Sequence, residues 1–270
     1  MNRTAVMYLD RKVNPPKFAR RFLRGLRELE AGAEYDLVYI LKGYNEGEPC
    51  PALQEHEALG GKKAQVFYVP DTLFALGTMQ MVARQLAHER ILIFLSWTRL
   101  ETANWLAPFE KAMDRQPNCG AVGATGSYEM RDERTPYPNY HVRTTAFMMK
   151  RELYLEMTEG RLGTATDEYE LEAGPDNLTK RMMARGMNPL VVDRFGAMYE
   201  IPEWYRAGTF RRGEQEGLIA SDNRTYDYEV SGPWRRRYLI RRAWGKQAKF
   251  KWKGWIARLK SAWRWHYGER

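Results

Sequence analysis

The sequence predicts an α/β fold with a mostly parallel sheet, because short apolar strands alternate with amphipathic helices along its N-terminal part. Two of these strands, 37–41 (LVYIL) and 91–95 (ILIFL), are continuously apolar, as expected of strands that helices cover on both faces. With 270 residues, 44% of them hydrophobic, the chain can form one large α/β domain, or one domain with an appendage.

The predicted elements of the N-terminal half alternate regularly. Apolar side chains at helical spacing after Pro16 predict a helix that ends at Gly32. In chain order, the expected elements are a strand at 5–9, a helix from Pro16, strands at 37–41 and 65–69, a helix at 76–87 and a strand at 91–95.

The C-terminal half is less regular. Its expected elements are short strands at 121–126, 144–149 and 189–192, a helix at 151–157 and a second helix that contains Leu178 and Met182. From 200 to 228 the chain is rich in Gly, Arg and Asn with little periodicity, which predicts a long functional loop or lid.

Polar residues follow each of the first four predicted strands. The strand ends are Asp10-Arg11, Lys42-Gly43-Tyr44-Asn45, Asp71 and Ser96-Trp97-Thr98. In parallel sheets with right-handed crossovers, ligands bind beyond the carboxyl ends of the strands. We therefore expect these four segments to converge on one crevice.

Several classes of protein are excluded or disfavoured. The sequence contains no GxGxxG, Walker A, GxSxG or HExxH motif, and its four histidines lack ligand spacing. Cys50 and Cys119 fit no metal or redox spacing, which favours free thiols in a reducing compartment. No secretory signal and no apolar run of about 20 residues is present, so a soluble cytoplasmic protein is expected.

The order of short motifs resembles a known family. In the first half the motifs are KGYN at 42–45, Asp71 with Gly77, FLSWTRL at 94–100, Trp105-Leu106 and VGATG at 122–126. In the second half they are PNYHVRT at 138–144, YELEAG at 169–174, Leu178-Thr179, TFRRGEQ at 209–215 and ASDNRT at 220–225. Together, over residues 4–228, they resemble the family 2-like glycosyltransferases of the GT-A fold. The second half is similar to a bacterial subgroup found with polysaccharide and lipopolysaccharide assembly genes.

The resemblance implies a GT-A-like, Rossmann-like sheet and the transfer of a sugar from a nucleotide-sugar donor to a hydroxyl of a glycan or lipid-linked acceptor. It implies donor binding by Lys42, Tyr44 and Asp71, where Asp71 matches the residue that contacts the nucleotide base. A helix N-cap is an equal alternative for Asp71, because an aspartate before a helical run is a common cap.

Ser96 and Thr98 occupy the positions at which the family usually has Asp-x-Asp, the motif that holds a divalent cation against the diphosphate. Hydroxyl groups bind Mg²⁺ or Mn²⁺ less well than carboxylates do. We therefore expect donor contacts from Ser96 and Thr98, assign no residue as a metal ligand, and leave a Mg²⁺ or Mn²⁺ cofactor as an open alternative.

Without a metal ion, the diphosphate charge has to be met by cationic side chains or backbone N–H groups. The candidates are Arg143, Arg211 and Arg212. For Arg211 and Arg212 the alternative is an ordinary solvated loop.

A carboxylate is expected to take the proton of the acceptor hydroxyl. The family keeps its base where this chain has Asp167, Glu168, Glu170 and Glu172. Similar enzymes have Glu-x-Gly or Glu-Ser-Gly there, so Glu172, followed by Ala173-Gly174, is the first candidate and Glu170 the second. The alternative is that acidic residues gather at a helix N-terminus because of the helix dipole.

His141 and Asp222 are the candidate acceptor-binding residues. His141 lies in a tyrosine-rich loop, where a structural histidine is equally common. Asp222 can instead build a turn by bonding its own backbone.

The C-terminal segment 231–270 is predicted to form a basic amphipathic tail after a glycosyltransferase domain at 1–230. Of the net charge of +9, residues 234–270 contribute +12, and six of the nine tryptophans lie between Trp234 and Trp265. From Trp252 onward, tryptophan and aliphatic residues recur at helical spacing between Lys and Arg, which is typical of a helix in a membrane interface.

This pattern predicts a peripheral protein at the inner, cytoplasmic face of an anionic membrane. Packing of the tail on the domain ranks second, and binding of single-stranded nucleic acid ranks last. For the whole chain, the alternatives to an enzyme are a non-catalytic binding or scaffold protein on a GT-A fold, for which the missing Asp-x-Asp is the best argument, and a nucleic-acid-associated protein.

Overall fold

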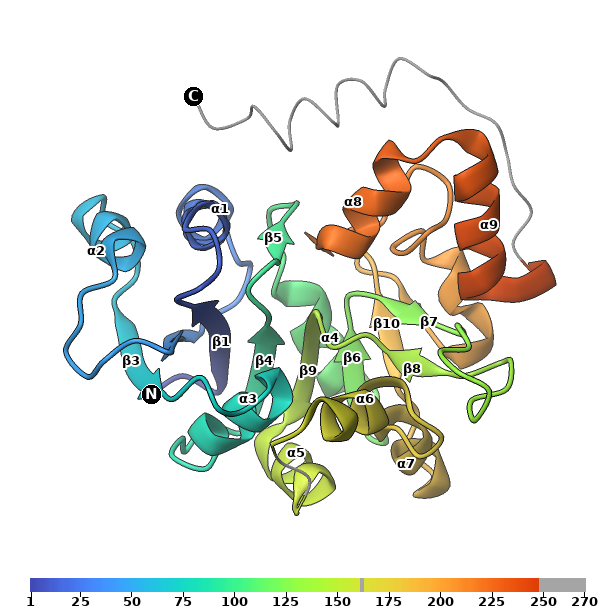
Figure 1. Ribbon diagram of the computed structural model, residues 1–270, viewed down its shortest axis with the longest axis horizontal. Helices are drawn as coiled ribbons and strands as arrows, with labels where there is room; N and C mark the ends of the chain where they lie inside the picture. Colours follow the sequence, from blue (N-terminus) through green and yellow to red (C-terminus); the bar gives the residue numbers. More distant parts are fainter. Residues whose placement is uncertain (161–162, 248–270) are drawn as a thin grey trace.

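The computed structural model describes residues 1–160 and 163–247, so the predicted helix from Trp252 lies outside the described residues. A central sheet contains eight strands in the order β11-β10-β6-β9-β4-β1-β2-β3 (Figure 1). Its strands are β1 (Thr4–Arg11), β2 (Asp36–Lys42), β3 (Ala64–Val69), β4 (Arg90–Phe94), β6 (Ala121–Gly123), β9 (Ala146–Lys150), β10 (Leu190–Val192) and β11 (Met198–Tyr199). β9 and β11 run antiparallel to their neighbours and the other pairs are parallel, which confirms the predicted α/β class.

Two hydrophobic cores lie on opposite faces of the sheet, and side chains of each strand alternate between them. In β1, Val6 and Tyr8 join one core while Met7 and Leu9 join the other. The first core is covered by α1 (Lys17–Glu28), α2 (Pro51–Ala58) and α4 (Ala107–Arg115). The second is covered by α3 (Ala75–Ala83), α5 (Arg151–Thr158), α6 (Ala165–Ala173), α7 (Leu178–Ala184) and α9 (Pro233–Trp244). Burial on both faces explains why these strands are apolar without interruption.

Two features bring the C-terminal half of the chain to the carboxyl ends of the parallel strands. Because β9 is antiparallel to β4, the residues before it, 143–145, lie where β4 ends. A separate two-stranded sheet pairs β5 (Arg99–Leu100) with β12 (Ala220–Ser221). The residue after β12, Asp222, therefore lies beside the residue before β5, Thr98.

The chain between 200 and 228 differs from the predicted loop. It contains the 3-10 helix η1 (Ile201–Arg206), β12 and most of α8 (Asn223–Val230). The sequence of α8 shows little apolar periodicity, and a capping box between Asp222 and Thr225 fixes its start. Phe210, Arg211 and Gln215 are buried, so this part of the segment is packed against the domain.

The described part of the predicted tail also packs against the domain. Leu239, Ile240, Ala243 and Trp244 of α9 are buried in the second core, and α9 is followed by η2 (Gly245–Gln247). The small sheet formed by β7 (Gly126–Ser127) and β8 (His141–Val142) lies below α9 in Figure 1. Within residues 1–160 and 163–247, no helix has the length and apolar character needed to cross a membrane.

Candidate functional site

Three adjacent strand ends meet in one cluster of charges. The carboxylate of Asp71, after β3, accepts hydrogen bonds from Nε and Nη2 of Arg11 at the end of β1, both at 2.7 Å. Nζ of Lys42, at the end of β2, lies 3.0 Å from Asp71 Oδ1. The hydrogen bond from Arg11, with help from Lys42, lowers the pKa of Asp71 to about 2. We call Arg11, Lys42 and Asp71 the strand-end triad.

A groove of about 730 Å³ adjoins the strand-end triad and is lined by residues 43–46 and 66–71. Its volume lies within the range of about 300–1,000 Å³ that is usual for small-molecule sites. The lining combines the aromatic side chains of Tyr44, Phe67 and Tyr68 with the carboxylate of Asp71. A flat polar ring such as a nucleotide base suits this combination of aromatic surface and hydrogen-bond acceptor.

Asp10 supports this groove through its contact with Tyr44, one of the lining residues. Its buried carboxylate accepts hydrogen bonds from the Tyr39 hydroxyl at 2.8 Å and the Cys50 thiol at 3.4 Å, and from Tyr44. Burial raises the pKa of Asp10 above its ordinary value, and these three hydrogen bonds oppose the increase. Asp10 thus holds Tyr44 and Cys50 in place rather than facing solvent.

The end of β4 does not fit a divalent cation. The Thr98 hydroxyl is buried and donates to the carbonyl oxygen of Thr145 at 3.1 Å. The Ser96 carbonyl oxygen accepts a hydrogen bond from Tyr8 at 3.0 Å. Within the described ranges, 1–160 and 163–247, no three His, Cys, Asp or Glu side chains are grouped to hold a metal ion. Trp97 is 41% exposed, and its ring lies 4.0 Å from that of Phe18.

The pairing of β5 with β12 places the carboxylate of Asp222 beside Thr98. Both oxygen atoms of this carboxylate already accept hydrogen bonds. Oδ2 accepts hydrogen bonds from Arg143 Nη2 and from the Thr145 hydroxyl, both at 2.7 Å. Oδ1 accepts from the backbone N–H groups of Arg224 and Thr225 at the start of α8. Burial favours the protonated form, but Arg143 and Thr145 outweigh it and lower the pKa of Asp222 to about 2. In the structure Asp222 bonds the backbone N–H groups that follow it and caps α8, in keeping with the structural alternative, and its role in acceptor binding stays a prediction.

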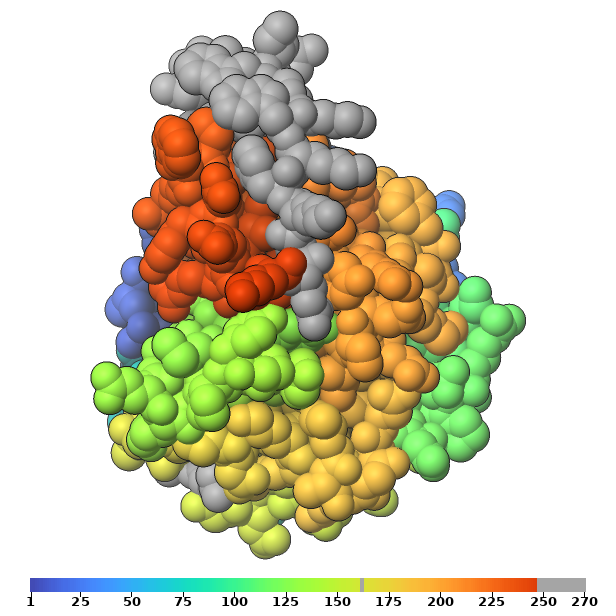
Figure 2. All heavy atoms as spheres, turned by 90° about the vertical axis from the view of Figure 1, so that its right-hand side faces the viewer, coloured from blue at the N-terminus to red at the C-terminus, as the bar shows by residue number. Residues whose placement is uncertain are grey.

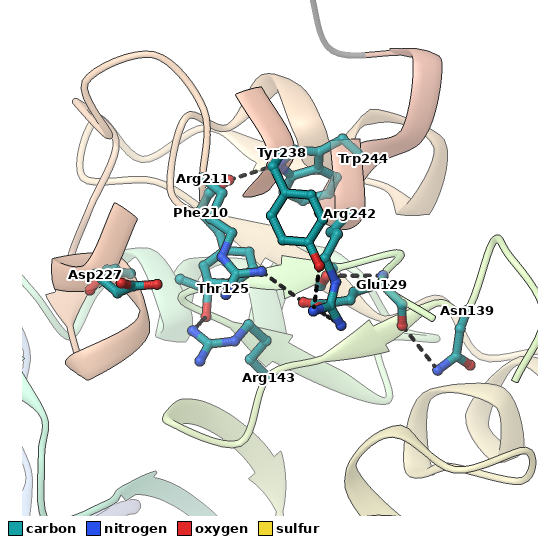
Figure 3. A network of polar contacts seen from close by, with 12 residues as sticks. Thr125, Glu129, Asn139, Arg143, Phe210, Arg211, Asp227, Tyr238, Arg242 and Trp244 are labelled. Carbon is teal, nitrogen blue, oxygen red and sulfur yellow. Dashed lines mark hydrogen bonds and ion pairs between the residues drawn. The ribbon is translucent and has the colours of Figure 1, made fainter. Parts of the chain in front are cut away.

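Arg143 belongs to a larger arginine cluster, which we define as Arg143, Arg211 and Arg242 with Glu129 and Asp222. Glu129 accepts from Arg211 at 2.9 Å and pairs with Arg242 at 2.6 Å (Figure 3). The Phe210 ring lies 4.2 Å from the guanidinium of Arg143 and 4.8 Å from that of Arg211. Three cations and two carboxylates leave this cluster with a net positive charge.

Arg211 is held in this cluster by its burial and by its backbone. Its φ of 45° is rare for a residue with a side chain, and its N–H donates to Gln215 Oε1 at 3.0 Å. Burial lowers the pKa of Arg211 to about 10, and its Nε atom is buried without a hydrogen-bond partner. Arg212 points elsewhere, over the ring of Tyr205 at 5.1 Å, so the structure does not bring it into the arginine cluster.

The acidic helix α6 holds Glu168 against the start of α3, close enough to Lys42 of the strand-end triad for their charges to interact. A carboxylate oxygen of Glu168 accepts a hydrogen bond from the N–H of Leu76, at the start of α3, at 3.0 Å. Burial raises the pKa of Glu168 to about 7, with the charge of Glu172 adding to the effect and Lys42 opposing it. Glu168 is thus a partly buried carboxyl group that can gain or lose a proton near neutral pH.

The two carboxylates favoured by the sequence pattern lie differently. Glu172 is four residues from Glu168 and shares its face of α6. Glu170 lies on another face and forms an ion pair with Arg134 at 2.7 Å. The sequence identifies Glu168 as a member of the acidic cluster. Its contact with α3 could not be predicted, because the two helices are distant in the chain.

His141 is a structural residue in this arrangement. It is 2% exposed, and its Nδ1 atom lies 2.8 Å from the Asn139 carbonyl oxygen. Burial lowers its pKa to about 4, with Arg143 contributing in the same direction. The neutral ring therefore packs inside the domain, which agrees with the structural alternative stated for it.

Comparisons of sequence give no relative: no family model matches the chain, and no curated protein matches it. Comparisons of fold find similar solved structures. The mannosyltransferase PcManGT from Pyrobaculum calidifontis, in complex with GDP-Man and Mn²⁺, matches with a TM-score of 0.49 and 16% identity over 68% of this chain and 53% of that chain. This chain thus spans about half the length of that mannosyltransferase.

Two further structures show the range of the matches. GalNAc-T7 with UDP, GalNAc and Mn²⁺ has a TM-score of 0.47 and 12% identity over 70% of this chain and 41% of that chain. CMP:2-keto-3-deoxy-manno-octonic acid synthetase complexed with CTP has a TM-score of 0.43 and 12% identity over 70% of this chain and 89% of that chain. These are likenesses in fold at low identity, and the function is argued from the residues of the site.

Proposed function

We propose that this protein is a glycosyltransferase that moves a sugar from a nucleotide-sugar donor to a hydroxyl group of a glycan or lipid-linked acceptor. The observation that carries the proposal is the groove next to the strand-end triad, together with Glu168, a half-buried carboxyl group with a pKa of about 7 whose charge interacts with that of Lys42. The reaction needs a carboxylate that accepts the proton of the acceptor hydroxyl and cationic groups that stabilise the leaving diphosphate, and the chain has both at this edge of the sheet.

The donor nucleotide binds along the carboxyl edge of the sheet. The base lies in the groove against Tyr44 and Tyr68, where Asp71 accepts a hydrogen bond from it. Four adjacent strands, β3, β2, β1 and β4, span roughly 14 Å at a spacing of about 4.8 Å. The ligand extends along this edge from the groove toward Thr98 and the arginine cluster.

Cationic side chains meet the charge of the diphosphate. Arg11 and Lys42 lie next to the groove. Arg143 lies near the end of β4, where its hydrogen bond to Asp222 holds its side chain. A guanidinium group can bind phosphate oxygens by two parallel hydrogen bonds. The residues at the end of β4 do not fit a divalent cation, so no step of the proposed reaction involves one.

In the chemical step, the acceptor oxygen attacks the anomeric carbon of the donor sugar. The bond from that carbon to the phosphate oxygen breaks, and the nucleoside diphosphate leaves with the electron pair. Glu168 takes the proton from the acceptor hydroxyl, and the positive charges at the edge stabilise the leaving diphosphate. A single displacement of this kind inverts the configuration at the anomeric carbon.

The first test is ligand-dependent thermal stability. The full chain is heated with UDP, GDP, CDP or dTDP and their common sugar derivatives, each with Mg²⁺, Mn²⁺ or EDTA. Binding to the native state alone adds about 2.7 kcal/mol of stability at 100 times Kd. We expect one nucleotide to raise the Tm, with the increase retained in EDTA. Absence of a shift with every nucleotide would contradict the donor site.

The second test separates chemistry from binding. Glu168→Gln is expected to lower kcat by about 10²- to 10⁴-fold while the nucleotide-induced Tm shift is retained. Glu170→Gln, on another face of the same helix, is expected to keep most of the activity. A larger loss of kcat in Glu170→Gln or Glu172→Gln than in Glu168→Gln would transfer the role of base to that residue.

The same pair of measurements decides between a transferase and a non-catalytic binding protein. A nucleotide-induced Tm shift without any release of nucleoside diphosphate from the matching sugar nucleotide, across glycan and lipid-linked acceptors, would favour the binding protein. Release that depends on Glu168 would favour the transferase.

A further inference from the structure

The solvent-facing side of α9 carries a stripe of aromatic and basic side chains. Trp234 is 81% exposed and Tyr238 is 55% exposed, and Arg237 and Arg241 are exposed beside them. These four residues are spaced at i, i+3, i+4 and i+7, so they form one row along the helix. We call this row the α9 stripe.

The stripe is a fixed part of the surface, because the opposite side of α9 is anchored in the domain. Leu239, Ile240 and Trp244 are buried, and Trp244 Nε1 donates to the Phe210 carbonyl oxygen at 2.7 Å. Buried Arg236 pairs with Glu214 at 2.9 Å. The side chains of the stripe therefore face outward from a rigid helix, and Figure 2 shows this C-terminal region, in red-orange, in the upper part of the molecule.

The charge of the stripe is uncompensated. No acidic residue occurs within α9, and within the described chain Arg237 and Arg241 have no ion-pair partner. The other two exposed arginines of the helix differ, because Arg235 pairs with Asp227 and Arg242 with Glu129. Exposed guanidinium groups next to an exposed indole and phenol ring are thus available to a partner.

We propose that the α9 stripe docks this protein onto a membrane surface that contains anionic phospholipids. Tryptophan and tyrosine partition into the headgroup region of a bilayer, and arginines beside them meet the anionic headgroups. The stripe is roughly 10 Å long, from seven residue steps of about 1.5 Å, and it is convex, which suits a flat surface. A single-stranded nucleic acid would instead need a basic groove with successive stacking platforms.

Docking through the stripe places the candidate site near the bilayer. The helix α8 begins after Asp222, beside Thr98 at the carboxyl end of β4, and Arg236 of α9 donates to the Tyr228 carbonyl oxygen of α8, so both helices lie toward the edge that carries the strand-end triad. A membrane-embedded acceptor would then approach the edge of the sheet directly. The docking itself does not depend on the proposed reaction and can be tested without a substrate.

The experiment is sedimentation of the full chain with vesicles. Phosphatidylglycerol and phosphatidylcholine in equal parts are compared with phosphatidylcholine alone, at low and at 0.5 M salt. We expect binding only to the anionic vesicles, weakened by salt. An arginine near an anionic surface contributes about 1 kcal/mol, which is roughly fivefold in binding, so Arg237→Gln/Arg241→Gln is expected to bind roughly 25-fold less tightly.

The matched control is Arg84→Gln/Arg115→Gln. Both of these arginines are exposed, and neither has an ion-pair partner within the described chain. They lie at the ends of α3 and α4, near the amino ends of the strands. The control removes the same net charge and is expected to lose much less of the binding. Trp234→Ser tests the aromatic part and is expected to weaken binding without changing its salt dependence.

Three outcomes would overturn the proposal. One is absence of binding to either vesicle, and another is equal loss of binding in the stripe variant and the control. The third is binding to a single-stranded oligonucleotide, abolished in the stripe variant, with no binding to vesicles. Unchanged circular dichroism and Tm show that each variant is folded.

Discussion

Asp71 and Asp222 both have a pKa of about 2, and each is bonded to an arginine, but their surroundings are opposite. The side chain of Asp71 is 33% exposed and lies at the rim of a groove. That of Asp222 is 4% exposed, and its oxygens also cap α8 and accept from Thr145. For Asp71 the low pKa arises chiefly from one bidentate arginine in contact with water. For Asp222 several partners overcome a large cost of burial.

The comparison shows that a low pKa does not by itself mark a functional carboxylate. Water can replace the partners of Asp71 at little cost, so a ligand can take over one of its hydrogen bonds. Removal of a partner from Asp222 leaves a charge buried and unpaired. The strand-end triad is therefore suited to binding and release, and Asp222 is suited to holding α8 in place.

The largest expected effect is the loss of stability in Asp222→Ala. This change leaves Arg143 buried beside Phe210 without its partner and removes the cap of α8, and we expect the free energy of unfolding to fall by about 3–5 kcal/mol. Asp71→Ala is expected to lower it by less, because the side chains of Asp71 and Arg11 are 33% and 43% exposed, although that of Lys42 is only 6% exposed. Urea denaturation measures both, and equal losses would remove the distinction between the two regions.

The next largest effect concerns His141, which lies against the arginine cluster. Its pKa is lowered from 6.5 to about 4 by burial, so between these values the unfolded chain binds more protons than the folded one. Stability is therefore full above pH 6.5 and falls as the pH decreases toward 4, by about 3 kcal/mol for a shift of this size. His141→Gln should flatten this part of the stability profile. A variant with the wild-type profile would show that another group causes the acid sensitivity.

A smaller effect of opposite sign is expected at Glu168. Its pKa is raised from 4.5 to about 7, so the folded state holds a proton that the unfolded state releases as the pH rises. Stability is lost between about pH 4.5 and 7, and partial exposure of Glu168 limits the loss to about 1–2 kcal/mol. Glu168→Gln should therefore be more stable than the wild type at pH 8 and equal to it at pH 4. Greater stability at both values would point to packing instead of charge.

The smallest expected effect is on ligand binding at the triad. Asp71→Asn keeps the shape of the side chain but removes its charge, and we expect Kd for the nucleotide that shifts the Tm to rise by about tenfold, equivalent to about 1.4 kcal/mol. Isothermal titration calorimetry measures Kd directly. Asp222→Asn provides the opposite pattern, with the larger change in stability and the smaller one in Kd for the folded protein.

The sequence predicted the sheet and the first three strand ends well, because those features are local. Apolar runs bounded by Pro, Gly and Asp locate β1 to β4, and parallel topology then places Arg11, Lys42 and Asp71 at one edge. The roles proposed for the site residues from the resemblance remain predictions. The burial of Asp222 and His141 was not predictable, because it depends on where α8 and β8 pack.

Two contacts could not be predicted from the sequence, and the physical reason is the same for both. The pairing of β5 with β12 joins Leu100 to Ala220, and Glu168 of α6 caps α3 at Leu76. Neither contact has a periodic pattern, since each consists of one or two residues that meet across the fold. The role of base proposed for Glu168 therefore could not be assigned from the sequence pattern.

The β5–β12 pair also has a consequence for how the protein is made. Its partners lie 120 residues apart in the chain, so the pair cannot form while the first half alone has left the ribosome. At a synthesis rate of about 5–20 residues per second, the end of β4 waits roughly 6–24 s for Asp222 and α8 to arrive. During that interval Trp97, Thr98 and the edge of β4 lack their later neighbours, so this part of the nascent chain is where we expect a chaperone to bind.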